Sequence, residues 1–444
     1  MIAKAPLEAW IAKKIGLSKD SFTRDELHSY QLQKLRETIG RARRHSSFYR
    51  ELLGSLSETA LTTVADLRRF PFTEAEDIRR QSPRFLCVSQ NDISRVVTLD
   101  SSGTTGSAKR LYFTEADQAL TIDYFQYGMA AVVEKGDRVL ILFPGERPGG
   151  LGDLLARAVQ RLGVEPIPHG IVTNIPATLE IIVRERVDSL VGIPTQVLAL
   201  ARYAEATGVP LRLKSVLISS DYVPWAIARE LKRIWGCAVF EHYGMTEMGL
   251  GGGTECAALN GCHLHEADLL LEIVDPLTGE VLPEGEEGEV VVTTLTRIGM
   301  PLIRYRTGDI TRIITEPCPC GARLRRIAKI TRRKNNAVIL RGGRQFVMSE
   351  LDEALFSVNK IIDFTATVDD KSRVTTLDIA ALSADKPDKA AESILSAALN
   401  TIPPLGQARE KGELSVNVNI TGCEGVLVPK AAKRSIMELK QADG

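Results

Sequence analysis

The chain has 444 residues, of which 44% are hydrophobic and 25% are charged, a composition typical of a globular protein with about two or three domains. The 56 basic residues equal the 56 acidic residues, so the net charge does not favour nucleic acid or an anionic membrane as a partner. No apolar run approaches the roughly 20 residues that span a bilayer, and the first residues lack the apolar core of a signal peptide. With seven cysteines and no export signal, we expect a cytoplasmic protein whose thiols are free or bind metal.

The sequence pattern predicts an α/β fold. A helix is expected over 26–44, and strands over 94–99 and 110–113 flank a loop rich in Gly, Ser and Thr. Amphipathic helices then alternate with apolar runs, which is typical of a mostly parallel sheet covered on both faces. The helices are expected over 116–133, 150–162, 176–186, 194–207 and 224–234, and the apolar runs are 139–143, 190–193, 215–218 and 238–240.

The pattern changes twice after this alternating region. Between about 268 and 316 it becomes β, with strands over 269–274 and 288–295, which indicates a β subdomain. Beyond Arg333 it mixes a strand-like segment at 375–379 with a helix at 388–399. We therefore predict a large N-terminal domain, 1–333, with parallel-rich sheets and a β subdomain, and a small α+β C-terminal domain, 334–444.

The first candidate site is the loop between the two early strands. Its glycines let backbone N–H groups converge, its hydroxyls add donors and its lysine adds a positive charge, which together suit a polyphosphate. A Ser/Thr/Gly-rich turn would give the same composition. The common phosphate loop, G-x-x-x-x-G-K-[ST], is absent from the chain. The candidate residues are Ser101, Ser102, Gly103, Thr104, Thr105, Gly106 and Lys109.

Two later motifs offer complementary chemistry. The first, Glu241 to Glu247, supplies an aromatic face for a base, a glycine for close approach and a carboxylate suited to Mg²⁺. A strand end followed by a helix cap would have a similar sequence. The other, Arg304 to Asp309, places a short carboxylate that can accept two hydrogen bonds from a ribose diol, unless it is a surface turn. Polar residues also follow the run 215–218, where parallel sheets bind ligands. These candidates are Glu241, His242, Tyr243, Gly244, Met245, Thr246, Glu247, Asp309, Ser219, Ser220 and Asp221.

The three motifs, in this order, resemble those of the adenylate-forming (acyl-CoA synthetase-like) superfamily. The likeness is greatest to its phenylacetate–CoA ligase branch and covers nearly the whole chain, with Ala108 where proline is usual and Arg110 where glycine is common. The resemblance implies how these residues bind MgATP. Lys109 and its loop would bind the triphosphate, Thr246 would contact the α-phosphate and Glu247 would hold Mg²⁺. Tyr243 would lie against the adenine, and Asp309 would bind the ribose.

The resemblance also implies a mobile C-terminal domain. The interdomain hinge corresponds to 333–336, where Arg333 keeps the usual arginine and is counted with the cofactor-binding residues, while Asn335 and Asn336 replace the usual acids. Asparagine tolerates unusual backbone torsions, so a hinge is still expected. Lys430 corresponds to the catalytic adenylation lysine, with Lys433 as the rival, and a basic solvated turn is the alternative.

A separate group of cysteines and histidines predicts a metal site. Thiolates and imidazoles suit structural Zn²⁺, and the turn from Cys318 to Gly321 can present two thiolates. Free thiols in a reducing cytosol are the alternative. The full group is Cys256, Cys262, His263, His265, Cys318 and Cys320, and the most economical ligand set is Cys256, His263, Cys318 and Cys320.

The resemblance, with the candidate residues above, implies an AMP-forming carboxylic acid–CoA ligase that uses ATP, Mg²⁺ and coenzyme A, with an aryl acid as substrate by analogy to the branch. The acid pocket is expected over 143–150, 169–173, 219–221 and 242–247, where Asp221 and His169 would add polarity unless His169 is a satisfied loop histidine. The alternatives are an adenylating enzyme that transfers AMP to a cofactor or an acyl group to a carrier-protein thiol, and a non-catalytic AMP-binding module. The acid, the final acceptor and the oligomeric state, a homodimer among the options, stay open.

Overall fold

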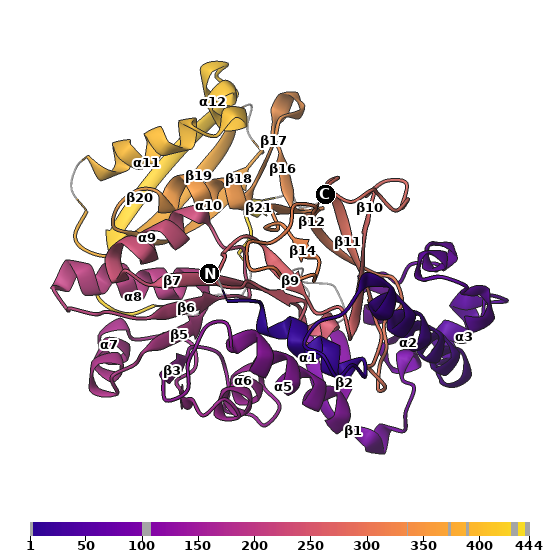
Figure 1. The fold of residues 1–444 in the computed structure, drawn as a ribbon. Coiled ribbons are helices and arrows are strands. Elements are labelled where there is room, and N and C mark those ends of the chain that lie inside the picture. The colour runs from indigo at the N-terminus through magenta and orange to yellow at the C-terminus, as the bar shows by residue number, and fades with distance from the viewer. Residues whose placement is uncertain are drawn as a thin grey trace. The chain divides into compact units, whose positions relative to one another are not determined.

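The computed structural model describes residues 3–99, 108–334, 336–371, 374–387, 390–427 and 434–439 (Figure 1). The chain divides into two compact units. The first comprises Met1–Lys135, Gly145–Val164 and Phe240–Ile330, and the second comprises Gly136–Pro144, Glu165–Val239 and Thr331–Gly444. The loop residues 101–106, Asn335, Lys430 and Lys433 lie outside the described residues. The boundary expected after Arg333 stays a prediction.

Helices form much of the first unit: α1 (Pro6–Lys14), α2 (Arg24–His45), α3 (Ser47–Leu53), α4 (Ala75–Gln81), α5 (Glu115–Met129) and α6 (Leu151–Gln160). Local capping explains where two of them begin. Thr23 and Glu26 form a reciprocal capping box at the start of α2, and Thr114 and Asp117 form one at the start of α5. Helix α1 packs on α5, where Trp10 stacks on Tyr127 with ring centroids 5.2 Å apart.

The strands of the first unit form antiparallel ladders. β1 (Ile93–Leu99) pairs with β2 (Lys109–Thr114), and β10 (Leu269–Val274), β11 (Gly288–Thr294) and β12 (Tyr305–Thr311) form the expected β subdomain. A further series joins β7 (Ala238–Tyr243), β8 (Gly253–Thr254), β9 (Cys262–Leu264), β14 (Arg326–Ile327) and β13 (Ile313–Ile314). These ladders and α2–α4 share a core that includes Leu35, Phe85 and Val292.

The second unit contains the predicted parallel sheet. Its strands lie in the order β6 (Ser215–Ile218), β5 (Ser189–Gly192), β3 (Arg138–Ile141) and β4 (Glu165–Pro168), and every neighbouring pair is parallel. Helices α7 (Ile175–Arg184), α8 (Pro194–Thr207) and α9 (Trp225–Trp235) connect or follow these strands. β5 and β6 are buried along their whole length, which explains why their sequences are apolar without alternation.

The C-terminal part of the second unit is α+β, as expected. A mixed sheet has the order β20 (Leu414–Gly422), β19 (Thr375–Ser383), β18 (Ile361–Asp369) and β21 (Met437–Leu439). The other strands and α-helices of this part are β15 (Arg332–Arg333), β16 (Ala337–Ile339), β17 (Gln345–Val347), α10 (Met348–Phe356), α11 (Ala391–Asn400) and α12 (Pro403–Glu410). This part shares one hydrophobic core with the parallel sheet, because residues such as Leu200, Phe356 and Ile379 belong to a single buried cluster.

No helix within the described ranges is both long enough and apolar enough to cross a bilayer.

Candidate nucleotide and metal sites

The β1–β2 ladder sets the position of Lys109. Leu99 pairs with Lys109 across the ladder, so the two ends of the intervening loop lie side by side. The Lys109 side chain is 11% exposed, and its Nζ forms an ion pair with Glu247 and lies 3.3 Å from the Tyr305 hydroxyl. The first and second sequence motifs therefore meet at this ion pair.

Glu247 is held in a short turn directly after β7. The turn is the 3₁₀ helix η5 (Thr246–Met248), and it ends at Gly249 in the left-handed conformation with a φ of 75°. The Glu247 carboxylate also accepts a hydrogen bond of 3.2 Å from the hydroxyl of Tyr305, the first residue of β12. A buried carboxylate that faces an ammonium group and a hydroxyl is a suitable hard-oxygen ligand for Mg²⁺ once the ammonium group moves to a phosphate.

The second and third motifs also converge. Tyr243 ends β7, and its hydroxyl donates a 3.1 Å hydrogen bond to Asp309 Oδ2 on β12. Asp309 is 4% exposed, and its backbone N–H donates to the hydroxyl of Thr307 at 3.0 Å. This arrangement puts an aromatic ring beside a fixed carboxylate, which is the pair expected to bind adenine and ribose.

The residues between Tyr243 and Glu247 have structural reasons for their identity. A Cβ atom on Gly244 would lie 2.4 Å from the carbonyl oxygen of Leu250, so only glycine fits there without a shift. Met245 is buried in the core of the first unit. Burial of the ring, which lies near Tyr124 and Phe125, lowers the pKa of His242 to about 4 and keeps this imidazole neutral.

Glu241 has an ionic partner that the sequence did not indicate. Its carboxylate forms an ion pair with Lys329, and its backbone N–H donates to Glu255 at 2.9 Å. Contact of Glu241, His242, Gly244 and Met245 with a ligand stays a prediction.

Several candidate residues belong to the second unit. Ser219, Ser220 and Asp221 follow β6 as expected, and Ser220 has a φ of 77°. Asp221 accepts hydrogen bonds from the backbone N–H groups of Tyr222, at 2.8 Å, and Arg434, at 3.0 Å. Arg333 lies in β15. The role of these residues in ligand binding stays a prediction.

His169 lies in the second unit as well, after β4. Its two ring nitrogens lie 3.1 Å from the hydroxyl of Thr178 and 3.1 Å from the carbonyl oxygen of Gly170. These contacts agree with the alternative of a satisfied loop histidine.

The predicted zinc ligands form a compact cluster in the first unit. The ligand atoms of Cys256, His263, Cys318 and Cys320 all lie within 4.8 Å of one another, and all four residues are buried. Cys256 follows β8, His263 lies in β9, and the two remaining cysteines lie between β13 and β14. Cys262 and His265 are engaged elsewhere: the Cys262 thiol donates to the Glu241 carbonyl, and His265 pairs with Asp268 at 2.7 Å.

The chemistry of this cluster fits Zn²⁺. Backbone N–H groups of Ala258 and Ala322 donate to the sulfurs of Cys256 and Cys320, each at 3.4 Å, as expected where thiolates need stabilisation. Burial raises the pKa of the Cys256 and Cys318 thiols, whereas at Cys320 the hydrogen bond from Ala322 helps to lower the pKa despite burial. Binding of a metal ion would therefore have to displace protons from Cys256 and Cys318. Burial lowers the pKa of His263 to about 4, so the imidazole is neutral, as a metal ligand must be.

Two site residues were missed in the sequence. Tyr305 stands in the sequence as part of the motif from Arg304 to Asp309, and its hydroxyl lies within hydrogen-bonding distance of both Glu247 and Lys109. Arg297 is buried and donates a 2.7 Å hydrogen bond to the carbonyl oxygen of Glu247. The sequence could have indicated Tyr305 as a site residue, because it adjoins a motif with a carboxylate. A single arginine in a turn, such as Arg297, gives no such indication.

Comparison with known proteins gives concordant results. The model of the AMP-binding enzyme family matches residues 49–296. Phenylacetate–coenzyme A ligase from Pseudomonas putida is 33% identical over 349 residues, which cover 76% of this chain and 77% of that protein. The enzyme of the same name from Aromatoleum evansii is 31% identical over 373 residues, which cover 80% and 82% of the two chains.

The fold agrees with these sequence relationships. The structure of 2-hydroxyisobutyryl-CoA ligase in the postadenylation state, in complex with 2-HIB-AMP, has a TM-score of 0.77 at 20% identity and covers 94% of this chain and 91% of that chain. Because the family model matches more than half of the chain, and because the two phenylacetate–coenzyme A ligases share more than 30% identity over most of it, this protein belongs to the AMP-binding enzyme family, in the branch of the phenylacetate–coenzyme A ligases.

Proposed function

We propose that this protein is an AMP-forming ligase that joins an aryl carboxylic acid to coenzyme A through an acyl-adenylate. The observation that carries the proposal is the convergence of the three motifs in the first unit, where Lys109 meets Glu247 and Tyr243 meets Asp309. The relationship to the phenylacetate–coenzyme A ligases supports coenzyme A as acceptor and an aryl acid as substrate. We also propose a cytoplasmic location, where cysteines such as the seven of this chain keep free or metal-binding thiols.

In the first step, a carboxylate oxygen of the acid attacks the α-phosphorus of ATP, and pyrophosphate leaves. This step needs positioning and charge neutralisation more than proton transfer. Lys109 would contact the triphosphate, Glu247 would hold Mg²⁺ and Asp309 would hold the ribose. Mg²⁺ would neutralise the phosphate charge that develops as pyrophosphate departs. Lys430, assigned by resemblance, would contact the carboxylate and the α-phosphate.

In the second step, the thiol of coenzyme A attacks the acyl carbon of the adenylate. The thiol loses its proton, the bond from the acyl carbon to the AMP oxygen breaks, and the thioester and AMP result. A rotation of the C-terminal domain about residues 333–336 would reshape the site between the steps. Because Asn335 and Asn336 replace the usual acids at this hinge, transfer to a different acceptor remains the second candidate.

ATP–pyrophosphate exchange with a panel of aryl and other carboxylic acids tests the first step. We expect exchange that depends on the acid and on Mg²⁺, and no exchange with any acid would contradict the proposal. Lys430→Ala should lower the exchange rate by about 100-fold or more, as loss of one preorganised electrostatic contact typically does. Lys433→Ala is the matched control, and the reverse pattern would move the role to Lys433. Thioester formation on addition of coenzyme A separates the ligase from an enzyme with another acceptor.

We further propose that Cys256, His263, Cys318 and Cys320 bind a structural Zn²⁺. Four protein ligands leave no coordination position for a substrate, so the metal would stabilise the loops after β8 and β13. Protein purified without added zinc should contain about one equivalent of the metal. Less than about half an equivalent would count against a closed site. Cys87→Ser is a suitable control, because Cys87 is buried outside the cluster.

A further inference from the structure

Arg297 is a buried cation whose hydrogen bonding is incomplete. It lies in the turn after β11 and is 5% exposed. Its Nη1 donates to the carbonyl oxygen of Glu247 at 2.7 Å, while Nε and Nη2 have no protein acceptor among the described residues. Burial lowers the pKa of Arg297, against the opposing influence of Asp117 and Glu247. A buried guanidinium with two unsatisfied nitrogens costs free energy of folding.

Arg202 is a buried arginine with a structural role, and its hydrogen bonding differs from that of Arg297. It is 3% exposed, and it donates to the carbonyl oxygens of Phe356 at 2.8 Å and Val358 at 3.0 Å and to the carboxylate of Glu230 at 3.2 Å. All three nitrogens of its guanidinium therefore have acceptors. Arg297 has one such acceptor, and that acceptor belongs to the expected magnesium ligand.

The surroundings of Arg297 fix its position closely. The Asp117 carboxylate accepts hydrogen bonds from the backbone N–H groups of the next two residues, Ile298 at 2.9 Å and Gly299 at 3.1 Å. A Cβ atom on Gly299 would lie 2.6 Å from Asp117 Oδ2, so a larger residue at that position would have to displace the carboxylate that holds this turn. The guanidinium carbon also lies 4.1 Å from the ring centroid of Phe113, on the strand that carries Lys109.

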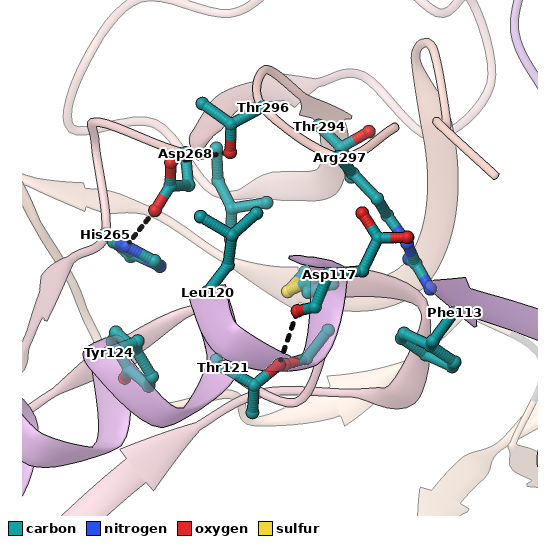
Figure 2. Close-up of a pocket in the computed structure, with 14 residues that line it drawn as sticks. Phe113, Asp117, Leu120, Thr121, Tyr124, His265, Asp268, Thr294, Thr296 and Arg297 are labelled. Atoms are coloured by element: carbon teal, nitrogen blue, oxygen red, sulfur yellow. Dashed lines mark hydrogen bonds and ion pairs between the residues drawn. The ribbon is translucent and has the colours of Figure 1, made fainter. Parts of the chain in front are cut away.

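Arg297 also lines a small cavity of about 30 Å³ beside α5, shown in Figure 2. In this view Arg297 extends past Asp117 toward Phe113, and Thr121 lies on the facing helix. The Thr121 hydroxyl donates to the carbonyl oxygen of Gly249 at 2.7 Å. Helix α5 therefore holds the end of the η5 turn, and Arg297 holds the same turn at Glu247. The cavity is large enough for about one or two waters, which suits the two remaining guanidinium nitrogens better than a larger ligand.

We propose that Arg297 is a positioning residue for the metal-binding carboxylate of Glu247, an inference that rests on the proposed function. Its hydrogen bond fixes the main chain at Glu247, and the α5 contacts fix the next turn. Its guanidinium, held at the Glu247 carbonyl oxygen, keeps its place when Lys109 leaves the carboxylate for a phosphate, so the main chain at Glu247 stays fixed. Arg297 touches neither ATP nor the acid in this role.

Calorimetric titration with ATP, with and without Mg²⁺, tests the inference without turnover. In the wild type, Mg²⁺ should strengthen ATP binding. In Arg297→Met this strengthening should fall about tenfold, the order expected when a hydrogen bond from a charged donor is lost. Arg297→Lys, which keeps the charge and a donor, should lie between the two proteins. Arg202→Met is the matched control, because it removes a buried arginine of the second unit and should keep the full effect of Mg²⁺.

The possible outcomes separate the inference from the proposed function. An unchanged effect of Mg²⁺ in Arg297→Met, with wild-type binding intact, would overturn the role of Arg297 alone. Should Arg297→Met fail to fold, the lysine variant decides, and an unchanged effect of Mg²⁺ in that variant overturns the inference. A wild type that binds no ATP in the presence of Mg²⁺ would overturn the proposed function and the inference together.

Discussion

The ion pair between Lys109 and Glu247 can be tested by a double-mutant cycle. The side chains are 11% and 5% exposed, so removing the lysine leaves a buried carboxylate without its ammonium partner. Breaking a buried ion pair in this way typically costs about 3–5 kcal/mol. Tyr305 still donates to Glu247, and Arg297 stays nearby, so we expect Lys109→Met to lower the free energy of unfolding by about 2–3 kcal/mol.

The cycle needs Lys109→Met, Glu247→Gln and the double variant, each without ATP. Because the double variant removes both members of the ion pair, it should be more stable than Lys109→Met, with a coupling free energy of about 2 kcal/mol. Urea denaturation followed by tryptophan fluorescence measures these differences, and Trp10 reports on the first unit. Effects that add to within about 0.5 kcal/mol would refute the coupling that the structure implies.

Three further predictions concern the first unit. Glu266 is fully buried, and although burial raises its pKa, Arg325 and Arg24 outweigh burial and lower it to about 2. Glu266→Gln should therefore lower the free energy of unfolding by about 3 kcal/mol at pH 7. Because folding favours the ionised carboxylate, this loss should shrink as the pH falls from about 4.5 to 2, which denaturation at several pH values measures. Gly244→Ala should weaken ATP binding in calorimetry while Gly208→Ala, at a helix end in the second unit, should not, because only the Gly244 position places a Cβ against another backbone segment. Cys318→Ser should abolish zinc retention and lower the melting temperature, and equal zinc in this variant and the wild type would contradict the assigned ligands.

The sequence predicted the regular elements well, because their hydrophobic periods are strong. The runs at 215–218 and 269–274 are strands with those bounds, and the helix at 194–207 matches α8. Strand β4 was missed because its sequence is Glu-Pro-Ile-Pro, and proline argues against a strand. The structure explains the exception, since β4 lies at the edge of the parallel sheet. Helix α1 was missed as well, because its nine residues are short for a periodic pattern.

Some residues of the candidate site could be identified from the sequence, and others could not. Lys109, Glu247 and Asp309 stand in contiguous motifs with distinct chemistry, so they could be identified before their contacts were known. The four-residue zinc cluster could also be chosen, because cysteine and histidine have few other uses in such a group. Arg297 could not be identified, because its importance depends on two residues that are distant in the sequence. It donates to Glu247, 50 positions away, and Asp117, about 180 positions away, holds the turn in which Arg297 lies. A long sequence separation of this kind leaves no local pattern.

The pairing of Lys109 with Glu247 also bears on how the site accepts MgATP. Without a ligand, the ammonium group and the carboxylate neutralise each other, and the site avoids burying an isolated charge. When ATP arrives with Mg²⁺, the ammonium group can exchange the carboxylate for a phosphate while the carboxylate exchanges the ammonium group for the metal ion. Each charge then keeps an opposite partner, so the exchange costs little only if both partners arrive together. ATP without Mg²⁺ would separate the pair and take the ammonium group from Glu247 without supplying a cation in its place, which is why we expect the nucleotide alone to bind more weakly.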